Sequence, residues 1–104
     1  MPKAFAEHEK TIIRQQLHKK GQQLFALHGL KKTSVDDLVQ AVGISKGAFY
    51  LFYASKEELL LEILEHIEVE LQTSVLTYAT RADGNARQHV RDLLGAAARL
   101  VHAA

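Results

Sequence analysis

The sequence predicts an all-α protein built from five helices. Proline occurs only at position 2 of the 104 residues, so no proline interrupts a helix further along the chain. Apolar residues recur at steps of three and four, without the period-2 alternation that is typical of strands. Hydrophobic residues make up 47% and charged residues 24% of the chain, the balance of one small globular domain.

A first helix is expected over about residues 6–27, before Gly29, which supplies a left-handed stop. Gly21 lies on its apolar stripe and costs about 1 kcal/mol in helix propensity relative to alanine. Such a glycine is tolerable where another helix approaches closely, so we expect a crossing there. The stripe consists of Ile13, Leu17, Gly21, Leu24 and His28, and Ile12 and Phe25 widen it.

Two short helices follow, joined by a tight turn. Thr33 or Ser34 can cap the first of them, and Ser34 stands three residues before Asp37, the spacing of a capping box. Residues 43–45 (GIS) form the turn, because Gly43 supplies a permissive backbone angle and Ser45 can cap the next helix, over about residues 46–53. With the first helix they predict a three-helix, homeodomain-like helix-turn-helix unit. Its small core is expected from Val35, Leu38, Val39, Val42, Ile44 and Phe49.

A long fourth helix begins at residues 55–58 (SKEE), a second capping-box pattern, and continues to about Tyr78. A loop over residues 81–85 follows, with Asn85 as the expected cap of a fifth helix. The fifth helix reaches Ala104 without a stop signal, which predicts a chain cut from something longer. The expected buried rows are Leu60, Ile63 or Leu64, Ile67, Leu71, Val75 and Tyr78, and then Val90, Leu94, Ala97 and Val101.

The charge is divided between the two halves of the chain. Residues 1–56 hold nine Lys and Arg against four Asp and Glu, so their net charge is 9 − 4 = +5. Residues 57–104 hold four against eight, so theirs is 4 − 8 = −4. Such asymmetry suggests that one end faces a polyanion, although a membrane surface or a solvated face would give the same balance. We therefore place the domain boundary between residues 56 and 57.

The third helix has an unusual surface once its packing residues are set aside. A solvated helix normally shows Glu, Lys and Gln, whereas this one shows a cation, two very small residues and aromatic rings. A helix that presses against the major groove of DNA needs small residues for close approach, lysine for phosphate or guanine, and a tyrosine hydroxyl for phosphate. The residues in question are Lys46, Gly47, Ala48, Tyr50, Leu51 and Phe52.

The order, spacing and caps of four segments resemble the N-terminal domain of TetR-family transcriptional regulators. These segments are residues 25–30 (FALHGL), 33–38 (TSVDDL), 42–50 (VGISKGAFY) and 55–59 (SKEEL), within a resemblance that covers about residues 10–65. The resemblance implies a homodimer that binds a palindromic operator in double-stranded DNA, with the third helix in the major groove. It also implies a small-molecule effector, held by a domain that begins in residues 57–104 and is incomplete here, and a role in repression.

Carried over onto this sequence, the family's pattern implies that Ser34 and Val35 lie beside a phosphate and that Tyr50 binds one. Lys56 matches a lysine that reaches the DNA backbone, where a helix N-terminus favours an anion. Two residues depart from the pattern, because Ala48 replaces a common threonine and Phe52 a common histidine. The predicted DNA-binding set is Thr33, Ser34, Val35, Ser45, Lys46, Gly47, Ala48, Tyr50, Leu51, Phe52 and Lys56.

Other function classes find little support in the sequence. There is no cysteine, no pair of histidines four residues apart, no Gly-rich phosphate loop and no nucleophile elbow, so neither a metal site nor an enzyme is predicted, and no cofactor. No signal core or membrane span is present, which indicates a cytoplasmic protein. A helical module that binds only proteins remains the alternative. Lys31 and Lys32 fit a solvated turn or a phosphate contact equally well.

Overall fold

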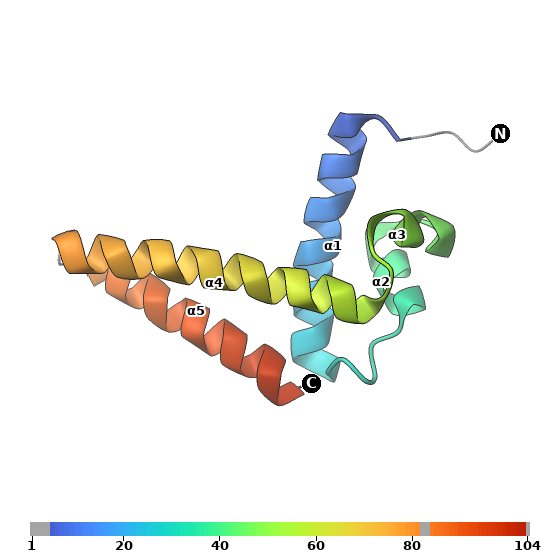
Figure 1. Ribbon diagram of the computed structural model, residues 1–104. Coiled ribbons are helices and arrows are strands. Elements are labelled where there is room, and N and C mark those ends of the chain that lie inside the picture. Colours follow the sequence, from blue (N-terminus) through green and yellow to red (C-terminus); the bar gives the residue numbers. More distant parts are fainter. Residues whose placement is uncertain (1–4, 82–83, 104) are drawn as a thin grey trace.

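The computed structural model describes residues 5–81 and 84–103, which form five helices (Figure 1). Figure 1 shows α1 crossing α4 steeply, α2 and α3 beside the N-terminal end of α4, and α5 running back along α4. Within these residues no helix is long and apolar enough to cross a membrane. The helices are α1 (Glu7–His28), α2 (Val35–Val42), α3 (Lys46–Phe52), α4 (Lys56–Arg81) and α5 (Gly84–Ala103).

The caps of the two short helices confirm their predicted boundaries. The Ser34 hydroxyl accepts the Asp37 amide at 3.0 Å, and the Asp37 carboxylate accepts the Ser34 amide at 2.9 Å, which completes the capping box. Gly43 ends α2 in the left-handed conformation (φ 85°, ψ 35°), which favours glycine. The Ser45 hydroxyl then accepts the Ala48 amide at 3.0 Å and starts α3. At α4 the box is altered, because the Glu58 carboxylate accepts the Ala54 amide instead of the Ser55 amide.

Gly21 is the point at which α1 and α4 approach most closely, as the sequence predicted. A Cβ atom on Gly21 would lie 3.1 Å from Leu59 Cδ2 and 3.2 Å from Ile63 Cδ1, closer than ordinary van der Waals contact. Leu17 and Phe25, one turn to either side of Gly21 on α1, are buried in the same core. The core thus runs along this crossing and fixes α1 against the first half of α4.

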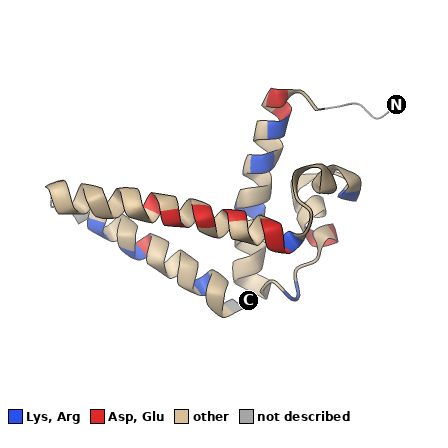
Figure 2. Ribbon diagram, in the orientation of Figure 1, with Lys and Arg blue, Asp and Glu red and all other residues tan. Residues whose placement is uncertain are grey.

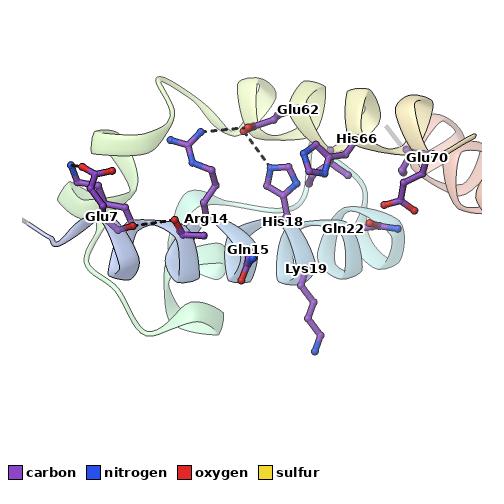
Figure 3. A pocket seen from close by; sticks show the side chains of 13 residues that line it. Glu7, Arg14, Gln15, His18, Lys19, Gln22, Glu62, His66 and Glu70 are labelled. Atoms are coloured by element: carbon purple, nitrogen blue, oxygen red, sulfur yellow. Dashed lines mark hydrogen bonds and ion pairs between the residues drawn. The ribbon is translucent and has the colours of Figure 1, made fainter. Parts of the chain in front are cut away.

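A second contact between the same helices is polar and surrounds Glu62 of α4 (Figure 3). Its carboxylate lies 3.5 Å from Arg14 Nη1 and 3.3 Å from His18 Nε2, both on α1. Burial opposes ionisation of Glu62, but the Tyr53 hydroxyl, His18 and Arg14 outweigh it and hold the pKa of the carboxyl below 4.5. A hollow of about 650 Å³ between α1 and α4 opens beside this contact, and its walls carry both signs of charge.

In the second half of the molecule, two of the predicted buried helix faces are partly wrong. On α4, Ser74 is buried, whereas Val75 and Tyr78 are exposed. On α5, Leu94 and Val101 were expected inside but are 52% and 63% exposed. The row that packs inward is Ala86, Leu93 and Leu100. This row and the one through Leu94 and Val101 both repeat every seven residues, so periodicity alone does not choose between them.

The helix ends also differ slightly from prediction. α1 includes His28, which is exposed and does not extend the apolar stripe as expected. Gly29 follows it with a positive φ (83°), as predicted for a glycine stop, but its ψ of 163° lies outside the left-handed helical region. α4 continues to Arg81, and Asn85 lies inside α5, where it was expected to be a cap. Part of the predicted loop, residues 82–83, lies outside the described residues.

Replacing Gly21 tests the close crossing. We expect Gly21→Leu to lower the free energy of unfolding by about 1–3 kcal/mol, because the larger side chain must displace Leu59 and Ile63. Gly95 of α5 offers a matched control, since a Cβ there meets only the flexible end of Arg99 at 3.4 Å. Gly95→Ala should raise stability by about 1 kcal/mol through helix propensity. Urea unfolding followed by circular dichroism measures both, and a fully stable Gly21→Leu variant would contradict the described crossing.

The α2 capping box predicts that the stability of the fold depends on pH. The Ser34 amide donates to the Asp37 carboxylate at 2.9 Å, and hydrogen bonding with Ser34 holds the pKa of this carboxyl below the ordinary 3.8. A group with a lowered pKa stabilises the fold above its unfolded value and loses this effect as the pH falls through its folded value. We therefore expect Asp37→Asn to lower the melting temperature at neutral pH and the difference from the wild type to vanish in strong acid. If the difference in melting temperature between Asp37→Asn and the wild type stayed constant from neutral pH to strong acid, the proposed effect of the Asp37 carboxylate would be wrong.

Candidate nucleic-acid interface

The N-terminal ends of α2, α3 and α4 meet around one shallow hollow on the surface. Its volume is about 380 Å³. The structure thereby brings together five residues of the predicted DNA-binding set, which come from three separate segments. The lining residues are Ser34, Val35, Asp36, Lys46, Tyr50, Ala54, Ser55, Lys56 and Glu57.

The exposed face of α3 carries Lys46, Gly47, Tyr50 and Leu51. Tyr50 is 51% exposed, and its ring meets the buried Phe49 ring edge-on, with centroids 5.4 Å apart. The Tyr50 ring thus packs on the buried Phe49 on one side, while about half of the Tyr50 side chain stays exposed. Leu51 is 74% exposed, an unusual position for a large apolar side chain on a helix of only seven residues.

Gly47 lies in the middle of this face, and nothing in the described part of the chain requires it to be glycine. A Cβ atom there would have the Ser45 hydroxyl, at 3.9 Å, as its only neighbour within 4 Å. Its φ is not among the positive values, which occur at Gly29 and Gly43. Glycine inside a helix lowers stability by about 1 kcal/mol relative to alanine. At Gly47, no internal packing contact within the described residues offsets this loss. Gly47 therefore differs from Gly21, where a neighbouring helix fills the space.

Lys46 is paired within the protein. Its ammonium lies 3.2 Å from the Asp36 carboxylate of α2, and more than half of each side chain is exposed. Sequence reasoning missed Asp36, because the two residues lie on different helices and no short-range spacing connects them. The pair reduces the positive charge that α3 presents, but solvent screens it and an anion can compete for the lysine.

Three predicted contact residues have side chains turned away from this face. Thr33 is 1% exposed, and its hydroxyl donates to the Gly29 carbonyl at 2.8 Å. Ala48 is 8% exposed, so its methyl group packs inside. Phe52 is half-buried, 6.3 Å from the Phe5 ring, with the Arg14 guanidinium 5.7 Å from its centroid. None of these three side chains therefore lies on the exposed face of α3, and a contact of these residues with DNA stays a prediction.

Lys56, predicted to bind a phosphate, has partners within the protein. Its ammonium donates to the backbone carbonyls of Leu30 at 2.6 Å, Thr33 at 2.9 Å and Lys31 at 3.4 Å. The side chain is therefore occupied by the connection between α1 and α2. The remaining members of the predicted set, Ser34 and Ser45, are exposed as helix caps, while Val35 is half-buried against the core.

The helices α4 and α5, which together form the second half of the chain, differ in charge (Figure 2). Acidic side chains run along the first half of α4, whereas α5 carries three arginines and one aspartate among its described side chains. Lys31 and Lys32 are exposed in the connection before α2. Among the described side chains, the net negative charge of the second half thus comes from α4, whereas that of α5 is positive.

The chain is similar to known DNA-binding regulators. Residues 19–63 match the family model described as bacterial regulatory proteins, tetR family. YuxN of Bacillus subtilis, an uncharacterized HTH-type transcriptional regulator, is 40% identical over 77 residues, which are 74% of this chain and 25% of YuxN. The transcriptional repressor DhaR of a Mycobacterium species is 33% identical over 66 residues, 64% of this chain and 33% of DhaR. AcrR of Shigella flexneri is 30% identical over 71 residues, 68% and 33% of the two chains.

The chain spans a quarter to a third of the length of these three relatives. No solved structure gives a significant match. The family model covers α2, α3, the second half of α1 and the start of α4, which are the elements that build the surface described above. The chain therefore belongs to the TetR family of DNA-binding transcriptional regulators, and residues 19–63 are its N-terminal helix-turn-helix domain.

Proposed function

We propose that the exposed face of α3 enters the major groove of an operator, with Lys46 and Leu51 toward base edges and Tyr50 toward a phosphate. Ser34, at the start of α2, supplies a second phosphate contact through its hydroxyl proton, and Ser45 and Val35 lie at the margin of the interface. Phosphate contacts of this kind fix the register of a helix in the groove, while base contacts give sequence preference. Because its ligand is chromosomal DNA, the protein acts in the cytoplasm.

The observation that carries this proposal is the open position of Gly47. A residue without a side chain, at the centre of an exposed helix face and without an internal reason to be glycine, suits a surface that another molecule approaches closely. The neighbours of Gly47 supply the chemistry expected at DNA, a lysine and a tyrosine whose side chain is about half exposed. The exposed Leu51 adds an apolar contact that suits a thymine methyl group.

We also propose that residues 57–104 form the beginning of an effector-binding and dimerisation domain, and that the protein is a ligand-responsive repressor acting as a homodimer. The exposed apolar side chains of α4 and α5, among them Val75, Tyr78, Leu94 and Val101, support this proposal, because such a surface is normally covered by further protein. The similarity to DhaR, a transcriptional repressor, supports repression over activation. A palindromic operator follows from two-fold symmetry.

Replacing Lys46 and Tyr50 tests the interface. Affinity for a mixed-sequence DNA duplex is measured by fluorescence anisotropy over about 50–200 mM salt. We expect Lys46→Ala to reduce the slope of log K against log salt by about 0.9, because one fewer cation displaces counterions. Tyr50→Phe should weaken binding about tenfold without changing the slope, since it removes a neutral donor to a charged group.

Arg91→Ala provides the control for this experiment, because Arg91 is an exposed cation on α5, which runs along α4 on the side away from α3 (Figure 1). It should leave both the affinity and the slope unchanged. If Lys46→Ala and Tyr50→Phe bind DNA as well as the wild type while their circular dichroism stays intact, the proposed placement of α3 is wrong. A wild-type chain with no DNA binding even at low salt would favour the alternative, a module that binds only proteins.

Replacing Asp36 tests the interface by an expected gain, and not a loss, of DNA affinity. Asp36→Asn should raise DNA affinity, because it releases Lys46 from its partner 3.2 Å away and removes a negative charge from the interface. The slope of log K against log salt should become steeper, since Lys46 then interacts with phosphate alone. Asp92→Asn removes an equal charge from an exposed position on α5 and controls for net charge. Equal gains from both substitutions would mean that the Asp36–Lys46 pair has no specific effect.

A further inference from the structure

The side chain of Lys56 joins the start of α4 to the connection between α1 and α2. Its ammonium has three protons, and three backbone carbonyls of the α1–α2 connection lie within 3.4 Å of it. The two shortest contacts, to Leu30 and Thr33, are partly buried. A charged donor of this kind makes hydrogen bonds that are stronger than those between neutral groups. Lys56 therefore links the first residue of α4 to the connection that leads into α2.

The same connection is held on its other side by Thr33. The Thr33 amide and hydroxyl both donate to the Gly29 carbonyl, at 3.2 and 2.8 Å, and its hydroxyl also lies 3.3 Å from the Leu24 carbonyl of α1. The Thr33 side chain thus fixes the connection to α1, while the Thr33 carbonyl receives Lys56. The next residue is Ser34, the N-cap of α2. The position of Ser34 relative to α4 consequently depends on the bonds made by Lys56.

We propose that Lys56 is a positioning residue for DNA binding, which holds the start of α2 at a fixed place relative to α4 and does not itself bind a phosphate. Through this link, the Ser34 phosphate contact is set by the position of α4. This inference rests on the proposed function, since it assigns a role within the same interface. It differs from a purely structural role, because it predicts that Lys56 and Ser34 act on DNA affinity together.

The first test compares Lys56→Met with Lys31→Met, which removes an exposed cation from the adjacent connection. Salt dependence of binding to the mixed-sequence duplex separates the two possible roles of Lys56. As a positioning residue, Lys56→Met weakens binding several-fold at each salt concentration and leaves the slope of log K against log salt unchanged. A fall in the slope of about 0.9 would mean that Lys56 binds a phosphate in the complex and would overturn the proposal. Unchanged affinity would overturn it as well.

The second test is a double-mutant cycle with Ser34→Ala. If Lys56 acts through Ser34, the loss caused by Ser34→Ala becomes smaller in the Lys56→Met background, so that the two losses do not multiply. Lys56→Arg keeps the charge and several donors, so it should restore part of this coupling. Losses that multiply in full would show that Lys56 and Ser34 contribute independently, and the inference would be wrong. Thermal melting of each variant ensures that affinities are compared at temperatures where the protein is folded.

A measurement on the unsubstituted protein does not depend on whether the variants fold. In NMR spectra of the side-chain ammonium nitrogens, the Lys56 signal should be shielded from exchange by its three carbonyls and should keep its shift when the duplex is added. The Lys46 signal should move. Movement of the Lys56 signal to the same extent as that of Lys46 would overturn the proposal. If the wild type binds no duplex at all, the proposed function fails; if it binds and only the Lys56 results disagree, this inference alone fails.

Discussion

The crossing of α1 over α4 at Gly21 is the constraint on which the rest of the structure depends. Only a residue without a side chain lets Leu59 and Ile63 lie within about 3 Å of the position that a Cβ would occupy. The crossing gives α2 and α3 a fixed platform, because these helices are too short to be stable alone. It also places the carboxylate of Glu62 where Arg14 and His18 can reach it, so that an apolar and a polar contact hold the same two helices.

The interface beside this platform is small, and most of its polar groups already have partners. The hydroxyls of Ser34 and Ser45 accept backbone amides as helix caps, and Lys46 is paired with Asp36. A hydroxyl that accepts in a cap still has its own proton to donate, so Ser34 can cap α2 and contact a phosphate at once. With few free cations, one such domain has only modest electrostatic attraction to DNA. Two half-sites held by a dimer would supply the affinity that a single domain lacks.

Local rules were enough to predict the helix-turn-helix unit, because its signals are short-range. Ser34 with Asp37, Gly43 and Ser45 each act within four residues, and the structure confirms all of them. The second half was harder, because α5 has two apolar rows with the same spacing and only its packing decides which row is buried. Burial of Thr33 and Ala48 likewise depends on long-range packing, so a pattern of DNA-contacting positions did not reveal it. The pairing of Lys56 with carbonyls 23 to 26 residues earlier has no local signal at all.

The long helix α4 connects the helix-turn-helix domain to α5, and its first turn contacts the connection that leads into α2. From Lys56 to Ile67 it is held by the α1–α2 connection, by Gly21 and by the contacts of Glu62, whereas its second half packs against α5. If the second half of α4 were displaced while the helix stayed straight, its first half would have to tilt against the contacts that hold it to α1 and to the α1–α2 connection. Because Lys56 precedes the crossing at Gly21 and the second half follows it, a tilt of α4 would move the two ends in opposite directions. Under the proposed ligand response, such a tilt would reach the start of α2 through the carbonyls that Lys56 holds.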